Sequence, residues 1–553
     1  MLLTNAFALV IPWLMKLAVD GLQKPGSILY GPPVCAGAIV LAALIHCVTR
    51  IFSRTLILNA ARVIEFRIRE DLFRCLTLLD QSYYAVTRSG DILSRFSNDL
   101  TNVRMLTGFG VMSAMNTLMM YLAAVTLMAR INPWLTFWAV LPFPLMVLLV
   151  KTISSRLFQR SLEAQEELAR LTSCAEESVS SVRLIKSYCR EGHFSELFSE
   201  TADRYLRCNL RLARLRGLII PIIAGATGAG TLVVLFVGGR AVIGGVMSLG
   251  DFVAFSGYLA MLVWPTAVMG WILTLAQRGA ASMSRLGEIL SAEPLVVDPP
   301  DAPPVADVSG HMELRSVEFS YQGTRVLDGV SLCIRAGERI GITGEVGSGK
   351  STLLRLLLRL APVDDGMIML DGRDINRIPL ADLRRLVGYV PQEPFLFSRS
   401  IAENISYGCH SSDPELVSQA ARQAGLAEDI ERFDGRYQAL IGEKGVMLSG
   451  GQKQRLALAR AVALNRRILL LDDPLSAVDA GREEDILTEL RRFYADRTVL
   501  VVSQRLSVFR DCDRVVVLRQ GRIAEQGTPA ELLRAGGLYA EMDRLQRLRA
   551  ELE

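Results

Sequence analysis

Long stretches without charge alternate with charged stretches in the first half of the chain. Five runs contain no Asp, Glu, Lys or Arg, namely Pro25–Thr49, Met105–Ala129, Ile131–Val150, Leu218–Gly239 and Phe252–Ala276. Each has 20 or more residues, about the length that an α-helix needs to cross roughly 30 Å of hydrocarbon. One such run is compatible with a buried core helix, but five within 280 residues predict a membrane domain.

A sixth apolar run, Met1–Met15, lies ahead of these and is followed by Lys16. It has neither the basic n-region nor the small-residue cleavage site of a signal peptide. An even number of spans is needed to return the chain to its starting side. We therefore interpret Met1–Val19 as the first of six membrane helices. It looks short, and we expect its true start to lie upstream.

Basic residues predict the orientation of these helices. Segment 59–105 carries seven arginines and segment 152–217 carries eleven basic residues, whereas the opposite loops carry one each, Lys24, Arg130 and Arg240. Because Lys and Arg concentrate on the cytoplasmic side, both long segments and both chain ends are expected there. The two segments contain few Gly or Pro. We therefore expect the membrane helices to continue into the cytosol and to turn near Tyr83–Gly90 and Val179–Tyr188.

Length and composition agree with two domains of different kinds. The chain has 553 residues, half of them apolar and a fifth charged, and the charge is concentrated after residue 310. A net charge of +4 does not point to nucleic acid as a partner. Nine scattered cysteines without a CxxC pair indicate reduced thiols in a cytosol-facing protein.

A proline-rich segment separates the two parts. Residues 293–310 hold five prolines and almost no helix signal, which predicts a linker. We expect a transmembrane domain over residues 1–292 and a globular domain over residues 311–553. The globular domain begins with the predicted strands Met312–Ser320, Val326–Ile334 and Arg339–Thr343.

A phosphate-binding loop follows the third of these strands and precedes a predicted helix, Thr352–Leu360. The loop consists of Gly344, Glu345, Val346, Gly347, Ser348, Gly349, Lys350 and Ser351. Glycines let backbone N–H groups turn inward around phosphates, and the helix N-terminus adds a favourable dipole. Lys350 is expected to contact the β- and γ-phosphates of a nucleotide, and Ser351 to ligate Mg²⁺.

Two further motifs complete the predicted site for binding and hydrolysing a nucleotide. The apolar strand 468–471 delivers Asp472 at its end, where a parallel sheet places catalytic groups, and we expect Asp472 to hold the Mg²⁺ shell. A second helix start carries the anion-binding residues Ser449, Gly450, Gly451 and Gln452. One phosphate chain does not need two such termini, so we expect the second to cap the γ-phosphate of ATP held by another subunit.

The phosphate loop, Asp472 and the sequence Leu-Ser-Gly-Gly-Gln at 448–452 together resemble the ATP-binding cassette (ABC) transporters, over essentially the whole chain. The resemblance implies a type I exporter: an all-α bundle of six transmembrane helices plus an α/β P-loop NTPase cassette. It implies adenine stacking on Tyr321, a loop glutamine, Gln392, that senses Mg²⁺ and the membrane-domain tips, and cross-subunit contacts at 443–445 and 476–479.

The membrane half agrees, since residues 87–99 are similar to the first cytoplasmic tip of exporters. The chain looks most like bacterial multidrug-resistance-like half-transporters of the MdlA type, on the runs 471–479, Trp264-Pro265 and Arg278-Gly279. The family usually has an amphipathic helix ahead of its first span. None is seen here, from which we expect a truncated N-terminus.

Two residues depart from the family pattern. Asp473 stands where the family usually has Glu, and Gln504 stands where it usually has His. Asp is one methylene shorter, which withdraws the catalytic carboxylate by roughly 1 Å and can cost about a hundredfold in rate. Gln can donate a hydrogen bond to the γ-phosphate but cannot carry positive charge to it. We expect a degenerate site that binds ATP and hydrolyses it slowly, the alternative being tolerated drift in an active site.

The resemblance therefore implies half of an exporter in the bacterial inner membrane that uses ATP and Mg²⁺ to move hydrophobic or amphiphilic compounds outward. A second half-transporter is the expected partner, in a heterodimer by preference and a homodimer otherwise. An ATP-gated channel or regulatory subunit is the alternative function. The fusion of the membrane and ATP-binding domains in one chain argues against an importer. The membrane runs exclude a soluble ATPase of DNA repair.

Cargo is weakly constrained by sequence. Seven Met and Trp residues in the uncharged runs have two interpretations: they line an adaptable apolar cavity, or they face lipid and neighbouring helices. They are Met112, Met115, Met119, Met120, Trp264, Met269 and Trp271. Arg50 and Arg54, near the inner end of the second helix, are compatible with anionic cargo or with snorkelling to the interface.

Overall fold

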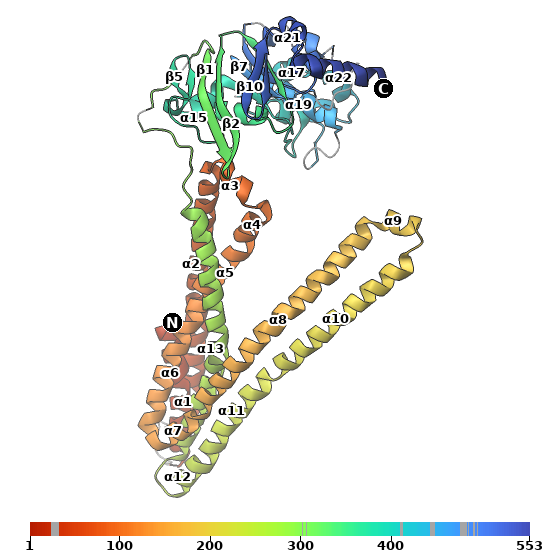
Figure 1. Cartoon of the computed structure of the whole chain (residues 1–553). Coiled ribbons are helices and arrows are strands. Elements are labelled where there is room, and N and C mark those ends of the chain that lie inside the picture. The colour runs from red at the N-terminus through yellow and green to blue at the C-terminus, as the bar shows by residue number, and fades with distance from the viewer. Residues whose placement is uncertain are drawn as a thin grey trace. The chain divides into compact units, whose positions relative to one another are not determined.

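The chain folds into two compact units. The computed structural model describes residues 1–23, 32–300, 302–305, 307–409, 413–442, 448–475, 484, 486–489, 493–494 and 496–552. One unit comprises Met1–Thr77 and Arg88–Ala292, and the other comprises Leu78–Thr87 and Glu293–Glu553 (Figure 1). The Pro-rich segment has no helix or strand in its described residues. All nine cysteines are free thiols.

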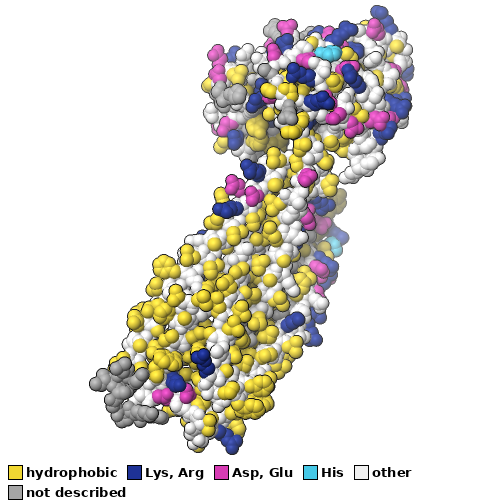
Figure 2. Space-filling model, turned by 90° about the vertical axis from the view of Figure 1, so that its left-hand side faces the viewer, with side chains coloured by type: hydrophobic (Ala, Val, Ile, Leu, Met, Phe, Trp, Pro, Cys, Tyr) yellow, Lys and Arg dark blue, Asp and Glu magenta, His cyan; other side chains and the backbone are white. Residues whose placement is uncertain are grey.

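Among the residues that the structure describes, six helical stretches of the first unit are long and apolar enough to cross a membrane, which confirms the expected bundle. They are Leu2–Leu22, Pro33–Leu78, Ser89–Ile131, Pro133–Ser180, Glu191–Ile243 and Leu249–Leu290. Hydrophobic side chains cover much of the face of this unit that Figure 2 shows. This follows from the absence of charge in the runs, because a lipid-facing helix presents apolar side chains outward.

Short helices turn the chain at the two predicted tips. The second span, α2 (Pro32–Leu78), is followed by α3 (Gln81–Val86) and α4 (Ser89–Ser94). The fourth span ends in α8 (Pro142–Ser180), which runs beside α10 (Glu191–Gly217) and is joined to it by α9 (Val182–Ser187) (Figure 1). The Asp80 carboxylate caps α3 and also accepts the Leu295 N–H at 2.7 Å.

The first helix is longer than the sequence suggested. Helix α1 spans Leu2–Gln23, 22 residues, and continues past Lys16. The Lys16 amine lies 2.6 Å from the Asp251 carboxylate at the start of α13 (Leu249–Leu290), so its charge is paired and does not end the helix. Asp20 accepts the Gly250 N–H at 2.9 Å. A Cβ at Gly250 would lie 2.4 Å from the Lys16 carbonyl oxygen, so this close approach requires glycine.

An ion pair between a buried aspartate and a partly exposed arginine joins the third and sixth spans. Asp99 directly precedes α5 (Leu100–Met105) and is 4% exposed, and its carboxylate accepts two hydrogen bonds from Arg285 on α13, one from Nε at 3.0 Å. Next to it, Asn102 donates to the Ser282 hydroxyl at 3.0 Å. A buried carboxylate is tolerated only with such partners, so this pair fixes the register of α5 on α13.

Two sheets form the second unit. Strands β1 (Met312–Tyr321), β2 (Thr324–Ile334), β4 (Ile368–Leu370) and β5 (Arg373–Asp374) make an antiparallel sheet in the order β2-β1-β4-β5. The larger sheet has the order β10-β9-β3-β8-β7-β6, with β9 at Arg514–Arg519 and β10 at Arg522–Gly527. Within it, β9 is followed by four further parallel strands, β3 (Arg339–Gly344), β8 (Thr498–Val502), β7 (Ile468–Asp472) and, at the edge, β6 (Val387–Val390).

The apolar runs explain the larger sheet. Every residue of β7 and β8 is buried, as expected of strands covered on both faces. Helices α14 (Lys350–Leu357) and α19 (Gly450–Ala463) contribute buried leucines and alanines to two cores that contain this sheet. The α/β cassette is confirmed.

Replacing Arg285 by Met should lower the thermal midpoint of the full chain in detergent. The change leaves the Asp99 carboxylate buried without its charged donor, at a cost of about 1–3 kcal/mol. Arg278→Met on the same helix is the matched control, since Arg278 has no ion pair among the described residues. Adding Asp99→Asn should recover part of the loss, and an equal midpoint for Arg285→Met and Arg278→Met would contradict the assigned role.

Candidate nucleotide site

Four neighbouring parallel strands end at one cavity. Its volume is about 290 Å³, and it is lined by residues that follow β3, β6, β7 and β8. Of the residues singled out in the sequence, the cavity brings together Gly347, Ser348, Gly349, Lys350, Ser351, Thr352, Gln392, Asp472, Asp473 and Gln504. The carboxyl ends of adjacent parallel strands meet at one edge, which explains why loops as far apart in sequence as those of Val346 and Gln504 converge here.

The backbone of the phosphate loop takes conformations that favour glycine. Gly344 has φ +145° and Gly349 has φ +98°. A Cβ at Gly344 would lie 2.0 Å from the Leu518 carbonyl oxygen, and one at Gly349 would lie 2.6 Å from the Leu327 side chain. Helix α14 starts at Lys350, two residues before the predicted start, so its first N–H groups border the cavity. These features fit a bound phosphate chain.

The Lys350 amine lies inside the loop. It donates to the carbonyl oxygens of Gly344 at 2.9 Å and Glu345 at 2.8 Å. Burial lowers the pKa of this amine below its usual range, and the carboxylates of Asp472 and Asp473 oppose that shift. Gly344 and Glu345 thus hold the lysine through their carbonyls but do not line the cavity themselves.

Asp472 and Ser351 present two oxygen ligands side by side. The Ser351 hydroxyl donates to Asp472 Oδ1 at 3.0 Å. Burial raises the pKa of Asp472, while the Ser351 hydrogen bond and the nearby Arg355 act in the opposite direction. A carboxylate and a hydroxyl at the mouth of a phosphate loop are the hard donors that Mg²⁺ takes, so these residues fit that ion.

Asp473 is tied to the neighbouring loop. Its φ is +50°, and its carboxylate accepts a hydrogen bond from the Ser503 hydroxyl at 3.0 Å. Gln504 follows Ser503 directly, is exposed and lines the cavity. The two residues that depart from the expected Glu and His therefore lie at the ends of adjacent strands, β7 and β8, in one connected site.

A contact that sequence reasoning missed positions Gln504. Gln546, on α22 (Leu538–Leu552), donates to the Gln504 carbonyl oxygen at 2.6 Å and accepts the Leu506 N–H at 3.1 Å. One side chain thus holds both ends of the turn at 504–506. A glutamine on a polar C-terminal helix carries no motif, so only tertiary structure reveals it.

The residues of the predicted second anion-binding helix start, Ser449–Gln452, here called the signature residues, do not line this cavity. Ser449 caps α19 by accepting the Gln452 N–H at 3.3 Å, and the Gln452 side chain bonds back to the Ser449 N–H. Ser449 and Gly450 are exposed. Tyr321 does not line the cavity either: it is 39% exposed and packs edge-on against Phe319. The expected cross-subunit contacts at 443–445 and 476–479 lie outside the described residues.

Comparison with known proteins gives consistent matches. Residues 1–266 match the model of the ABC transporter transmembrane region, and residues 327–476 match that of the ABC transporter. The chain is 34% identical to the multidrug resistance-like ATP-binding protein MdlA of Escherichia coli, over 99% of this chain and 92% of that protein. It is 35% identical to the probable multidrug resistance ABC transporter ATP-binding/permease protein YheI of Bacillus subtilis, over 99% and 94%.

Two further matches extend the comparison. The ATP-dependent lipid A-core flippase of Syntrophus aciditrophicus is 30% identical over 99% of this chain and 91% of its own length. A solved structure of a bacterial Atm1-family ABC exporter with ATP bound superposes with a TM-score of 0.79 at 28% identity, covering 99% of this chain and 96% of that one.

Gln546→Ala should increase hydrogen exchange at the backbone amides of residues 504–506, because both hydrogen bonds to that turn are lost. Gln546→Glu keeps the acceptor for the Leu506 N–H but loses the donor, so its exchange should be intermediate. Exchange of α14 amides serves as an internal reference. Unchanged exchange at 504–506 in Gln546→Ala would show that the turn is held by other contacts.

Proposed function

This chain belongs to the ABC transporter family, as an exporter with its membrane and ATP-binding domains in one polypeptide, and on that premise we propose that it is one half of a dimeric pump for hydrophobic or amphiphilic compounds. It is a multi-pass protein of the bacterial inner membrane with a cytoplasmic ATP-binding domain. The named relatives include multidrug resistance-like proteins and a lipid A-core flippase, which support this class of cargo.

The observation that carries the proposal is the convergence of four loops on one cavity. Lys350 would give up its carbonyl acceptors and pair with the β- and γ-phosphates of the substrate ATP. Ser351, Asp472 and Gln392 would hold Mg²⁺, which when bound neutralises charge on the phosphates. The glycines of the loop leave room for the backbone N–H groups to surround the phosphate chain.

Hydrolysis at this chain's own site is proposed to be slow. The Asp473 carboxylate is shorter than the usual Glu and is bonded to Ser503, which draws it toward β8. Gln504 supplies a neutral side chain where a cationic imidazole would stabilise developing charge. Binding of ATP depends on the intact loop, so we propose that this site binds ATP and holds it for long periods without hydrolysing it.

The signature residues supply the argument for a second polypeptide. Ser449 and Gly450 are exposed at the start of α19 and do not border this chain's own cavity. A helix N-terminus favours an anion, so this one would cover the γ-phosphate in a partner's site. We propose a heterodimer, because in a homodimer both sites would carry Asp and Gln in place of Glu and His.

Closure of the two ATP-binding domains on nucleotide is the proposed source of movement. The short helices α3 and α9, at the tips of the long helical extensions, are compact elements that could transmit that movement to the membrane helices. Opening after hydrolysis at the competent site would return the bundle to its inward-facing state.

Asp473→Glu combined with Gln504→His should raise hydrolysis at this chain's site by about tenfold or more, since both changes restore groups that act in the transition state. The readout is the Lys350-dependent rate: ATP hydrolysis of the assembly purified from membranes, minus that of the matched assembly carrying Lys350→Ala. If the double variant leaves the Lys350-dependent rate unchanged, Asp473 and Gln504 do not slow hydrolysis and the proposed degenerate site is contradicted.

The full chain purified without any other half-transporter should hydrolyse ATP slowly, and copurification with its partner should raise the rate. The reason is that only the partner would supply the Glu and His that act beside this chain's Ser449–Gln452. Brisk hydrolysis by the isolated chain, lost on Lys350→Ala, would count against an obligate heterodimer and favour an active homodimer.

A further inference from the structure

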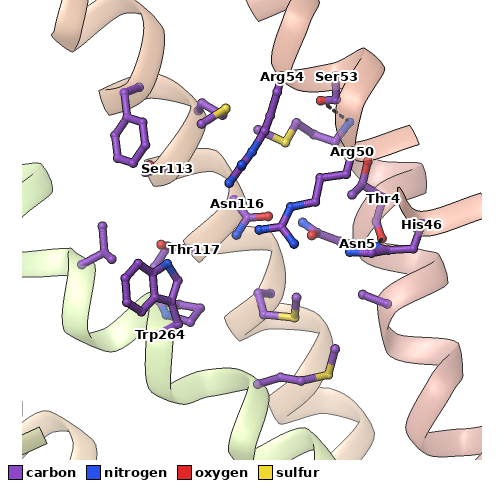
Figure 3. Close-up of a pocket in the computed structure, with 18 residues that line it drawn as sticks. Thr4, Asn5, His46, Arg50, Ser53, Arg54, Ser113, Asn116, Thr117 and Trp264 are labelled. Atoms are coloured by element: carbon purple, nitrogen blue, oxygen red, sulfur yellow. Dashed lines mark hydrogen bonds between the residues drawn. The ribbon is translucent and has the colours of Figure 1, made fainter. Parts of the chain in front are cut away.

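A second cavity, of about 260 Å³, lies within the membrane domain, among α1, α2, α6 (Val111–Ile131) and α13 (Figure 3). This is just below the roughly 300–1,000 Å³ of small-molecule sites, enough for a headgroup and the beginning of a chain. The cavity has two kinds of lining, one polar and basic and the other apolar.

Two arginines one turn apart form the basic side. Arg50 and Arg54 extend from α2 toward Asn116 on α6 in Figure 3. None of the 18 residues that line the cavity is acidic. Within the described ranges neither arginine forms an ion pair, unlike Lys16 and Arg285 elsewhere in this domain. Two guanidinium groups that share a cavity repel each other and attract an anion.

Two buried polar groups on α1 also face the cavity. Thr4 and Asn5 are each 5% exposed and line it. The Thr4 hydroxyl oxygen and the Asn5 amide nitrogen have no hydrogen-bond partner in the part of the chain that the structure describes. Buried donors are normally satisfied, so these two indicate that a polar group of a ligand belongs there.

The apolar wall includes three of the seven Met and Trp residues for which the sequence left a cavity or a lipid-facing position open. Met112, Met120 and Trp264 line the cavity, whereas Met115, Met119, Met269 and Trp271 do not. Methionine side chains adapt to tails of different shape, and the Trp264 ring offers a flat apolar surface. Apolar and basic linings in one cavity match a ligand that has a charged head and an apolar tail.

We propose that this cavity binds an amphiphile through an anionic headgroup, such as a phosphate, sulfate or carboxylate, with Arg50 and Arg54 as its counter-ions. Asn5 and Thr4 donate hydrogen bonds to the head, and the tail lies against Met112, Met120 and Trp264. This assignment rests on the proposed transport function, of which it specifies the cargo class. Snorkelling alone would not explain the unsatisfied groups on α1, which point into the same cavity.

The test measures binding of three probes to the full chain in phosphatidylcholine nanodiscs by calorimetry, with empty nanodiscs subtracted. Dodecyl phosphate should bind about tenfold or more tightly than dodecyltrimethylammonium, which has the same tail and the opposite charge. Inorganic phosphate alone should bind much more weakly, since it lacks the tail. Equal affinity for the two amphiphiles, or for inorganic and dodecyl phosphate, would overturn the proposal.

Paired variants locate the site. Arg50→Gln with Arg54→Gln should weaken dodecyl phosphate binding about tenfold or more. Arg62→Gln with Arg67→Gln, on the same helix and outside the cavity lining, removes the same charge and should change nothing. Arg50→Lys with Arg54→Lys keeps the charge and should retain part of the affinity. Equal loss in the cavity pair and the control pair would overturn the assignment.

Two arms separate the remaining outcomes. The binding of dodecyl phosphate is repeated in nanodiscs that contain phosphatidylglycerol. Loss of binding identifies an anionic membrane lipid as the occupant, and retained binding identifies a free amphiphile. Both results support a site for an anionic headgroup. Retention of ATP is compared in parallel with that of Lys350→Ala. If ATP is retained through Lys350 and dodecyl phosphate does not bind, the cavity assignment fails alone. If Lys350 makes no difference, the proposed function fails.

Discussion

Parallel pairing of β3, β8, β7 and β6 is the constraint on which the nucleotide site depends. Ile342 and Asp472 both lie opposite Val502 in the ladder, and Val390 lies opposite Leu471. These registers bring the phosphate loop, Asp472, the Asp473–Ser503 hydrogen bond and Gln392 to one edge of the sheet. A shift of one residue would turn the Asp472 side chain to the other face of the sheet. The sheet holds that register because β7 and β8 are apolar throughout and buried on both faces.

The membrane domain depends on a related constraint, the cost of leaving a shielded charge without a partner. Lys16 is paired with Asp251, and Arg285 is paired with Asp99. Each pair joins two spans that are far apart in sequence and so aligns them. Arg50 and Arg54 differ from these residues because they border a cavity whose described lining contains no carboxylate.

The sequence predicts those features that depend on local pattern. Uncharged runs predict six spans, prolines predict the linker, and glycines with Lys350 predict the phosphate loop. Residue spacing predicts the first span only as far as Val19, whereas α1 ends at Gln23, because the Asp20 contact with the Gly250 N–H joins positions more than 200 residues apart. The Gln546 contact was not predictable for the same reason, since α22 carries no motif. For the cavity beside Arg50 the sequence left two interpretations open, and only tertiary packing brings Thr4 and Asn5 to the same lining.

The central claim is that a second polypeptide covers the nucleotide bound to this chain. The most direct test is to measure the mass of the protein particles that retain ATP. The assembly would be purified from membranes in detergent, incubated with ATP and Mg²⁺, and separated from free nucleotide by gel filtration before its particles are weighed individually. Retained ATP should coincide with particles of two polypeptides. Equally long retention by particles that hold a single chain would contradict the claim.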